Sequence, residues 1–240
     1  MTLMLLLACT KAEIQETAPP YTAEPKPEGG EIVTLTTRDG VDIVADHYTA
    51  SGDDRPLVVF VHMDPTGSWN RDNWPGEVLQ PLVDADFHVM VIDRRGAGDS
   101  SGVASEAFET VKGAYDIEAA VLGVDGFSEL MLVGASNGTT SVLDYAALAG
   151  TEGWTAPSAF AMLSAVGATT NNHAIADMPA LPGWFGYPAS EADNNAPWQE
   201  VDPGEWSFTL YDPGAHGTRM FAEAPDCAPE LTAWLIGQEG

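Results

Sequence analysis

The chain has 240 residues, of which 45% are hydrophobic, and this length and composition suit one globular domain with a sizeable core. Its charge is strongly one-sided, because 9 Lys and Arg residues oppose 36 Asp and Glu residues for a formal net charge of −27. Such a surface repels phosphate backbones, so the composition argues against nucleic acid as a partner.

The first residues form a short apolar run, residues 1–8, that ends at Cys9. The run is far too short to span a bilayer. Its end, Leu6-Leu7-Ala8-Cys9, resembles the lipobox of bacterial lipoproteins, in which the cysteine becomes the acylated first residue. The resemblance implies a signal segment over residues 1–8, lipidation of Cys9, and a lipid anchor on the periplasmic or extracellular face of a bacterial membrane in the cell envelope. With Cys9 acylated, Cys227 has no disulfide partner.

Residues 9–30 are rich in Pro, Glu and Thr and lack apolar periodicity. Such a segment cannot bury enough apolar surface to fold, so we expect an extended tether. The folded domain is then expected over residues 31–240. It begins with two alternating runs, residues 31–37 and 41–48, joined by Arg38-Asp39-Gly40, in which Asp-Gly is a hairpin signal.

The remaining elements follow from apolar runs and from apolar residues at helical spacing. Strands are expected over residues 56–61, 87–92, 129–133 and 159–165, with shorter ones near Trp184 and Trp206. Helices are expected over residues 77–85, 106–124, 139–148 and 229–236. A hairpin followed by alternating strands and helices predicts an α/β fold with a mostly parallel sheet covered on both faces.

The segment Gly134-Ala135-Ser136-Asn137-Gly138 lies between an expected strand and an expected helix. This is the setting that a G-x-S-x-G nucleophile elbow requires, because a serine in a sharp turn at the end of a strand projects its hydroxyl clear of the sheet. The free N–H groups of the following helix point back at the serine, where an oxyanion would form. The pattern predicts Ser136 as a nucleophile.

Over residues 31–238 the chain resembles an α/β-hydrolase, and three further stretches carry the likeness. Residues 58–64 resemble the segment with His-Gly-x after the third strand, although Met63 replaces the glycine. Residues 93–100 resemble the D-x-R-G-x-G-x-S scaffold loop. Residues 211–217 resemble the loop that carries the catalytic histidine. The resemblance implies the α/β-hydrolase fold, with eight mostly parallel strands, an N-terminal antiparallel hairpin and no cap domain.

The resemblance also implies the site residues. His216 is the expected base, with His173 as its rival, and His62 is expected to be structural. The oxyanion hole is expected to be formed by the backbone N–H of Asn137 and that of either Met63 or Asp64.

The triad acid is less clearly indicated. Glu191 and Asp193 share a face if the strand near Trp184 continues through them. Asp193 lies further toward the end of the sheet at which α/β folds hold their sites, and it matches the position of the family's acid better. Asp193 is therefore favoured over Glu191, with Asp212 a distant third.

These residues predict a serine hydrolase that cleaves a small-molecule ester through an acyl-enzyme. The alternatives are a thioesterase, amidase or acyltransferase on the same triad, or a non-catalytic surface protein that keeps the fold. The triad chemistry requires no cofactor, and the sequence contains neither an H-E-x-x-H motif nor paired cysteines for a metal.

Overall fold

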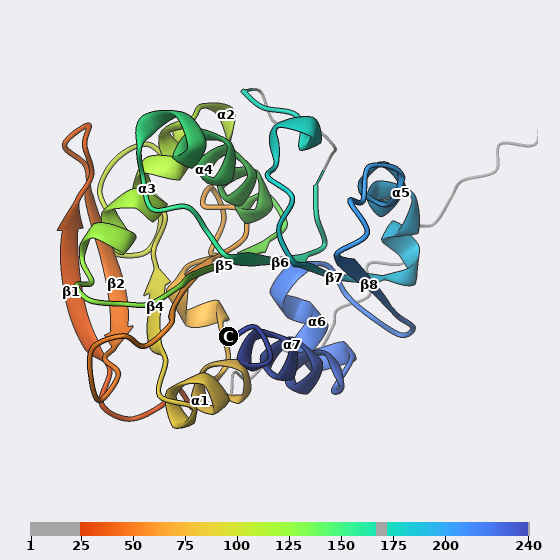
Figure 1. Cartoon of the computed structure of the whole chain (residues 1–240), viewed down its shortest axis with the longest axis horizontal. Coiled ribbons are helices and arrows are strands. Elements are labelled where there is room, and N and C mark those ends of the chain that lie inside the picture. Colours follow the sequence, from red (N-terminus) through yellow and green to blue (C-terminus); the bar gives the residue numbers. More distant parts are fainter. Residues whose placement is uncertain (1–24, 167–171, 240) are drawn as a thin grey trace, which may run out of the picture.

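The alternating and apolar runs of the sequence form one eight-stranded sheet in the computed structural model, which describes residues 25–166 and 172–239 (Figure 1). The strand order is β1-β2-β4-β3-β5-β6-β7-β8. The strands are β1 (Glu31–Thr36), β2 (Asp42–Tyr48), β3 (Leu57–Val61), β4 (His88–Ile92), β5 (Leu130–Ala135), β6 (Ala159–Leu163), β7 (Gly183–Pro188) and β8 (Trp206–Tyr211). The hairpin β1–β2 and the pair β2–β4 are antiparallel, and every other pair is parallel. The expected fold class is confirmed.

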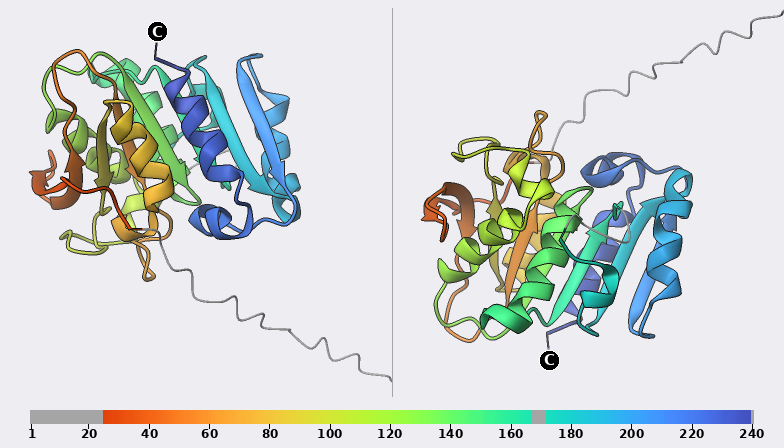
Figure 2. Two further views of the ribbon diagram at one scale, coloured as in Figure 1. Left: turned by 90° about the horizontal axis from the view of Figure 1, so that it is seen from below. Right: turned by 90° about the horizontal axis from the view of Figure 1, so that it is seen from above.

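Helices cover both faces of this sheet (Figures 1 and 2). The longer helices are α1 (Gly76–Asp84), α3 (Lys112–Leu122), α4 (Gly138–Glu152), α5 (Ala192–Glu200) and α7 (Cys227–Ile236), and the single-turn helices are α2 (Glu106–Glu109) and α6 (Met220–Glu223). The core on one face joins α3, α4 and α5 to the sheet, and the core on the other face joins α1, α6 and α7 to it.

The central strand β3 shows why the parallel strands read as continuous apolar runs. All five of its residues are buried. Val59 and Val61 face the core on the α3 and α4 side, whereas Val58 and Phe60 face the core on the α1 and α7 side. A strand covered on both faces has no polar face to show, so alternation disappears from its sequence.

The structure departs from the expected elements in several places, among them the short helix α6, which was not expected. The single helix expected over residues 106–124 is two helices, because Thr110 is extended (φ −133°, ψ 169°) and its hydroxyl accepts a hydrogen bond from the N–H of Lys112. Helix α5 was not expected. Residues 25–30, assigned to the tether, lie against the domain, since Pro27 is buried and Lys26 pairs with Asp46 and Asp72.

The connection between β6 and β7 carries no cap in its described part. It contains only a single 3-10 turn, Ile175–Asp177, before β7 begins. Within residues 25–166 and 172–239, no helix is both long and apolar enough to cross a membrane. Cys9, the predicted lipidation site, lies outside the described residues.

The turn between β5 and α4 is sterically tight, and this tightness positions the site. A Cβ at Gly138 would lie 2.5 Å from the carbonyl oxygen of Val61 and 2.6 Å from that of His62. A Cβ at Gly134 would lie 3.0 Å from the backbone of Gly138. The glycines therefore allow α4 to start directly against the end of β3.

We expect Gly138→Ala to destabilise the protein by about 3 kcal/mol, because the methyl group meets backbone oxygens that cannot move aside as a side chain would. Gly150→Ala in the same helix is the matched control. Nothing lies within 4 Å of the added methyl group at that exposed position, so this change should stabilise the protein by about 0.5–1 kcal/mol. Urea unfolding followed by circular dichroism measures both effects. Equal stabilities for the two variants would contradict the steric account.

Candidate active site

Ser136 lies in the turn directly after β5 and has a left-handed backbone conformation, with φ of +50°. This conformation is strained for a residue with a side chain, and it points the hydroxyl away from the sheet. Nε2 of His216 lies 2.6 Å from Oγ of Ser136. The expected nucleophile and the expected base are thus within hydrogen-bond reach.

Two buried side chains, on the side of the loop that faces the protein interior, fix the backbone after His216. The N–H of Gly217 donates to Oγ of Ser164 at 2.9 Å, and the N–H of Thr218 donates to the sulfur of Met63 at 3.2 Å. Gly217 has a φ of +59°, and a Cβ there would lie 2.0 Å from that same sulfur. Only glycine fits this position. The loop that these contacts fix holds the His216 ring over Ser136, and about a third of the His216 side chain remains exposed.

The carboxylate that meets the histidine is that of Glu191, with Oε1 lying 2.6 Å from Nδ1 of His216. This corrects the preference for Asp193. The chain does not continue as a strand beyond β7, because residues Ala189–Glu191 form a 3-10 turn after Pro188. Asp193 then falls in the first turn of α5, where it is exposed. Asp212, the third choice, is exposed at the end of β8.

The four other histidines are engaged elsewhere. His173, the expected rival base, has its Nδ1 2.9 Å from Oδ1 of the buried Asp144 in α4. His47 and His88 stack on each other across β2 and β4, with ring centroids 5.8 Å apart. His62 is bonded through both ring nitrogens to the backbone of Arg94 and Met63. The structure therefore brings only His216 to the nucleophile among the histidines.

His62 follows β3 and is fully buried. Its Nε2 accepts the N–H of Arg94 at 2.9 Å, so Nδ1 must carry the proton and donate it to the carbonyl of Met63, 2.9 Å away. Burial and the nearby Arg94 cation lower the pKa of His62 to about 3. A neutral, fully bonded imidazole inside the core has a structural role, as the sequence indicated.

The carbonyls around the elbow reveal where its N–H groups point. In a trans peptide the C=O and the N–H point in opposite directions. The carbonyl of Ser136 accepts from the N–H and the hydroxyl of Thr139, at 2.9 and 2.6 Å, so the N–H of Asn137 points away from α4. No described residue supplies that N–H with an acceptor. Asn137 thus presents a free donor beside Ser136.

The same reasoning applies to the loop after β3. The carbonyl of Met63 is held from below by His62 and by Arg94, at 2.9 and 3.2 Å, so the N–H of Asp64 in the same peptide points the other way. The carboxylate of Asp64 accepts from the N–H and the hydroxyl of Thr66. It is therefore turned into its own loop. Of the two expected donors, Asp64 has the more firmly oriented peptide.

The loop after β4 ties neighbouring segments together, which is the scaffold role that its sequence implied. Asp93 accepts from the backbone N–H and the guanidinium of Arg71 and from the N–H of Asp99. Arg95 pairs with the buried Asp116 at 2.9 Å and with Asp39. The loop after β4 is therefore fixed by buried polar contacts to Arg71, Asp116 and Asp39.

Sequence reasoning missed three contributors: Ser164, the sulfur of Met63 and Arg94. Ser164 directly follows β6 at the carboxyl edge of the sheet and has a φ of +51°. Its place at the end of an expected strand was the signal that could have indicated a site residue, because α/β folds hold their sites at this edge. The sulfur and the guanidinium act through contacts between distant segments, which no local pattern reveals.

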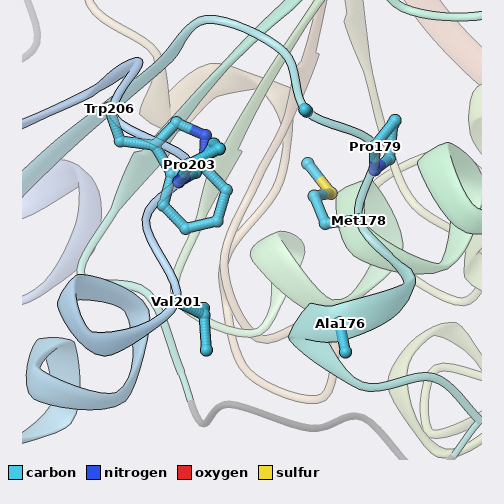
Figure 3. A pocket seen from close by; sticks show the side chains of 7 residues that line it. Ala176, Met178, Pro179, Val201, Pro203 and Trp206 are labelled. Carbon is cyan, nitrogen blue, oxygen red and sulfur yellow. The ribbon is translucent and has the colours of Figure 1, made fainter.

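A small apolar cavity of about 150 Å³ lies away from these residues (Figure 3). Its lining residues are Ala176, Met178, Pro179, Ala180, Val201, Pro203 and Trp206. Trp206 begins β8, whereas the loop of His216 follows its end, so the two sites are about one strand length apart, roughly 17 Å. The described residues contain no group of three or more His, Cys, Asp or Glu side chains arranged as a metal site.

Solved structures with the same fold include different hydrolases. A serine hydrolase without a lid from Xanthomonas campestris has a TM-score of 0.62 and 17% identity, covering 88% of this chain and 95% of its own. The esterase RhEst1 from Rhodococcus sp. has a TM-score of 0.67 and 19% identity, covering 87% and 99%. The Cif epoxide hydrolase from Acinetobacter nosocomialis has a TM-score of 0.63 and 11% identity, covering 88% and 90%.

At such identities these likenesses establish the fold and leave the reaction open. No curated protein sequence matches the chain. A protein-family model with the description "alpha/beta hydrolase fold" matches residues 56–211, which is more than half of the chain. Together with the sheet order and the elbow, this match shows that the chain belongs to the α/β-hydrolase family.

Proposed function

We propose that this protein is a serine hydrolase that cleaves carboxylic esters through an acyl-enzyme. The observation that carries the proposal is the position of the His216 ring, whose two nitrogens lie 2.6 Å from Ser136 and 2.6 Å from Glu191. A nucleophile, a base and an acid in this sequence of contacts form the arrangement that activates a serine hydroxyl.

In the proposed mechanism each group has one role. As Oγ of Ser136 attacks the ester carbonyl carbon, its proton passes to Nε2 of His216. Glu191 accepts the hydrogen bond from Nδ1, which fixes the tautomer and stabilises the imidazolium. The N–H groups of Asn137 and Asp64 hold the oxyanion. The imidazolium then gives its proton to the departing alcohol. Water next attacks the acyl carbon and passes a proton to Nε2 of His216, which returns it to Oγ of Ser136 as the acyl–Oγ bond breaks and the carboxylic acid leaves.

The surroundings favour hydrolysis over acyl transfer and over a non-catalytic role. The described connection between β6 and β7 carries no cap, and about a third of the His216 side chain is exposed, so the site admits water for the second half of the reaction. Efficient acyl transfer to another acceptor requires that water be kept out. A non-catalytic protein would have no need for the strained φ of Ser136 or for the loop contacts that hold His216.

The first test is labelling and turnover. The wild-type protein should react with a fluorophosphonate probe and hydrolyse p-nitrophenyl esters, and a series of graded acyl length identifies the preferred chain. Ser136→Ala should lose both reactions while keeping its unfolding midpoint, because the change removes only one hydroxyl. Labelling at a different serine in this variant, with turnover unchanged, would refute the assignment.

The acid is tested by a matched pair of amide substitutions. Glu191→Gln should lower kcat by about 10³–10⁴-fold, because the amide no longer fixes the productive tautomer of His216. Asp193→Asn, two residues further on and exposed, should keep kcat within about two-fold. Steady-state kinetics of both purified variants decide the matter. A large loss in Asp193→Asn with little change in Glu191→Gln would transfer the role to Asp193.

We also propose that Cys9 is acylated and holds the protein on the outer side of a bacterial membrane. The lipobox-like sequence and the Pro-rich segment after it support this proposal. Stable anchoring takes two or more acyl chains, which a processed lipobox cysteine would carry.

Cys9→Ser should move the protein from the membrane fraction to the soluble fraction and prevent incorporation of labelled fatty acid. Cys227→Ala is the control, because Cys227 is a buried thiol and the change should leave fractionation as in the wild type. The comparison is made in a bacterial host with the native start present. Membrane association that persists in Cys9→Ser would rule out the anchor.

A further inference from the structure

Arg94 is the one fully buried cation of the described chain without a carboxylate partner. The salt bridges of the described residues engage every lysine and arginine there except Arg94 and Arg219, and Arg219 is exposed. In a chain with 36 acidic residues, pairing is easily available. Asp116 and Asp64 act on the charge of Arg94 only at longer range, so its direct contacts show what the guanidinium positions.

The guanidinium instead joins the two loops that carry the proposed oxyanion donors. Nη1 donates to Oδ1 of Asn137 at 2.7 Å and to the carbonyl of Met63 at 3.2 Å, and more distantly to the carbonyl of His62 at 3.4 Å. Nη2 donates to the carbonyl of Asn137 at 3.3 Å. One planar, rigid fork thus fixes the separation of the elbow from the loop after β3.

The other contacts of Nη2 anchor the fork itself. It donates to the carbonyl of Ala107 at 2.6 Å and to the hydroxyl of Ser141 in α4 at 2.9 Å. Burial lowers the pKa of Arg94 to about 10, so the side chain remains charged at neutral pH. Its Nε is buried without an acceptor in the described structure. A buried, incompletely bonded cation costs stability that a well-packed apolar side chain would not.

We propose that Arg94 is a positioning residue of the oxyanion hole. It holds the Asn137 turn and the Met63–Asp64 peptide at a fixed separation, and it places a positive charge on the buried side of both. This inference rests on the proposed serine hydrolase function.

The charge of Arg94 and the N–H groups of Asn137 and Asp64 favour the anionic tetrahedral intermediate over the bound ester, and this difference sets the expected kinetic effect. The ester in the ground state is neutral, whereas the tetrahedral intermediate carries the negative charge. Interactions that are stronger in the transition state than in the ground state raise kcat without lowering KM. Loss of Arg94 should therefore reduce kcat and leave KM nearly unchanged.

The experiment compares Arg94→Lys and Arg94→Met with Arg95→Lys and Arg95→Met. Arg95 is the neighbouring buried arginine, and its contacts are with Asp116 and Asp39 rather than with the oxyanion loops. Each kcat is expressed per active site, titrated with the fluorophosphonate probe, so that a loss of folded protein does not count as a loss of activity. Inhibition by a trifluoromethyl ketone, which forms an anionic tetrahedral adduct with the serine, is measured in parallel.

We expect kcat to fall about 10–100-fold in Arg94→Met, which is below the loss for direct removal of an oxyanion donor. Arg94→Lys keeps the charge but cannot span both loops, so its kcat should fall about 3–10-fold. Binding of the ketone should weaken by similar factors, with KM within about two-fold. Both Arg95 variants should keep kcat per site within about two-fold, whatever their stability.

If Arg94→Met fails to fold, the inference is tested with Arg94→Lys alone. Wild-type kcat and ketone affinity in Arg94→Lys would overturn the inference while leaving the proposed function intact. The same losses in the Arg95 variants would also overturn it, because they would show a general effect of disturbing the core. A wild-type protein that neither labels nor hydrolyses esters would overturn the proposed function and this inference together.

Discussion

The close approach of α4 to the end of β3 is the contact on which the candidate site depends. Gly138 starts the helix against the carbonyl oxygens of Val61 and His62, where no side chain fits. The preceding turn then has no room to relax, and Ser136 is held at a positive φ. One steric condition thereby sets the distance between the nucleophile, the N–H of Asn137 and the donor loop that follows β3.

The other parts of the site reach this turn because parallel strands end at one edge of the sheet. Ser136 follows β5, Glu191 follows β7 and His216 follows β8, and these strands lie within four neighbouring positions of the sheet. The loop of His216 is held on its buried side by the hydroxyl of Ser164 and the sulfur of Met63. The turn of Ser136 is held on its buried side by the guanidinium of Arg94, which bonds to Asn137. Hydrogen bonds in such a low-dielectric interior are strong and geometrically demanding. The reacting groups are therefore fixed through their backbones while the histidine ring keeps access to solvent.

Local patterns were sufficient for much of this arrangement. The hairpin, the buried strands and the elbow depend on residues close in sequence, so their positions followed from periodicity and turn chemistry. Glu191 was ranked second because Asp193 was expected further toward the end of an extended strand and matched the position of the family's acid better. The 3-10 turn over Ala189–Glu191 ends the strand before either residue, so distance along an extended chain does not apply. The break between α2 and α3 was missed for a similar reason, since a single extended residue, Thr110, interrupts an otherwise helical pattern. The contacts of Arg94 join segments from four parts of the chain, and no local pattern contains that information.

The central claim is that Ser136, His216 and Glu191 act together, with an oxyanion held by two backbone donors. A crystal structure of the protein after reaction with a fluorophosphonate tests it most directly, because the phosphonyl adduct mimics the tetrahedral intermediate. The account predicts phosphorus bonded to Oγ of Ser136 and a phosphonyl oxygen about 3 Å from the backbone nitrogens of Asn137 and Asp64. Nδ1 of His216 should remain bonded to Glu191. An adduct on another residue, a phosphonyl oxygen directed into solvent, or His216 paired with Asp193 would contradict it.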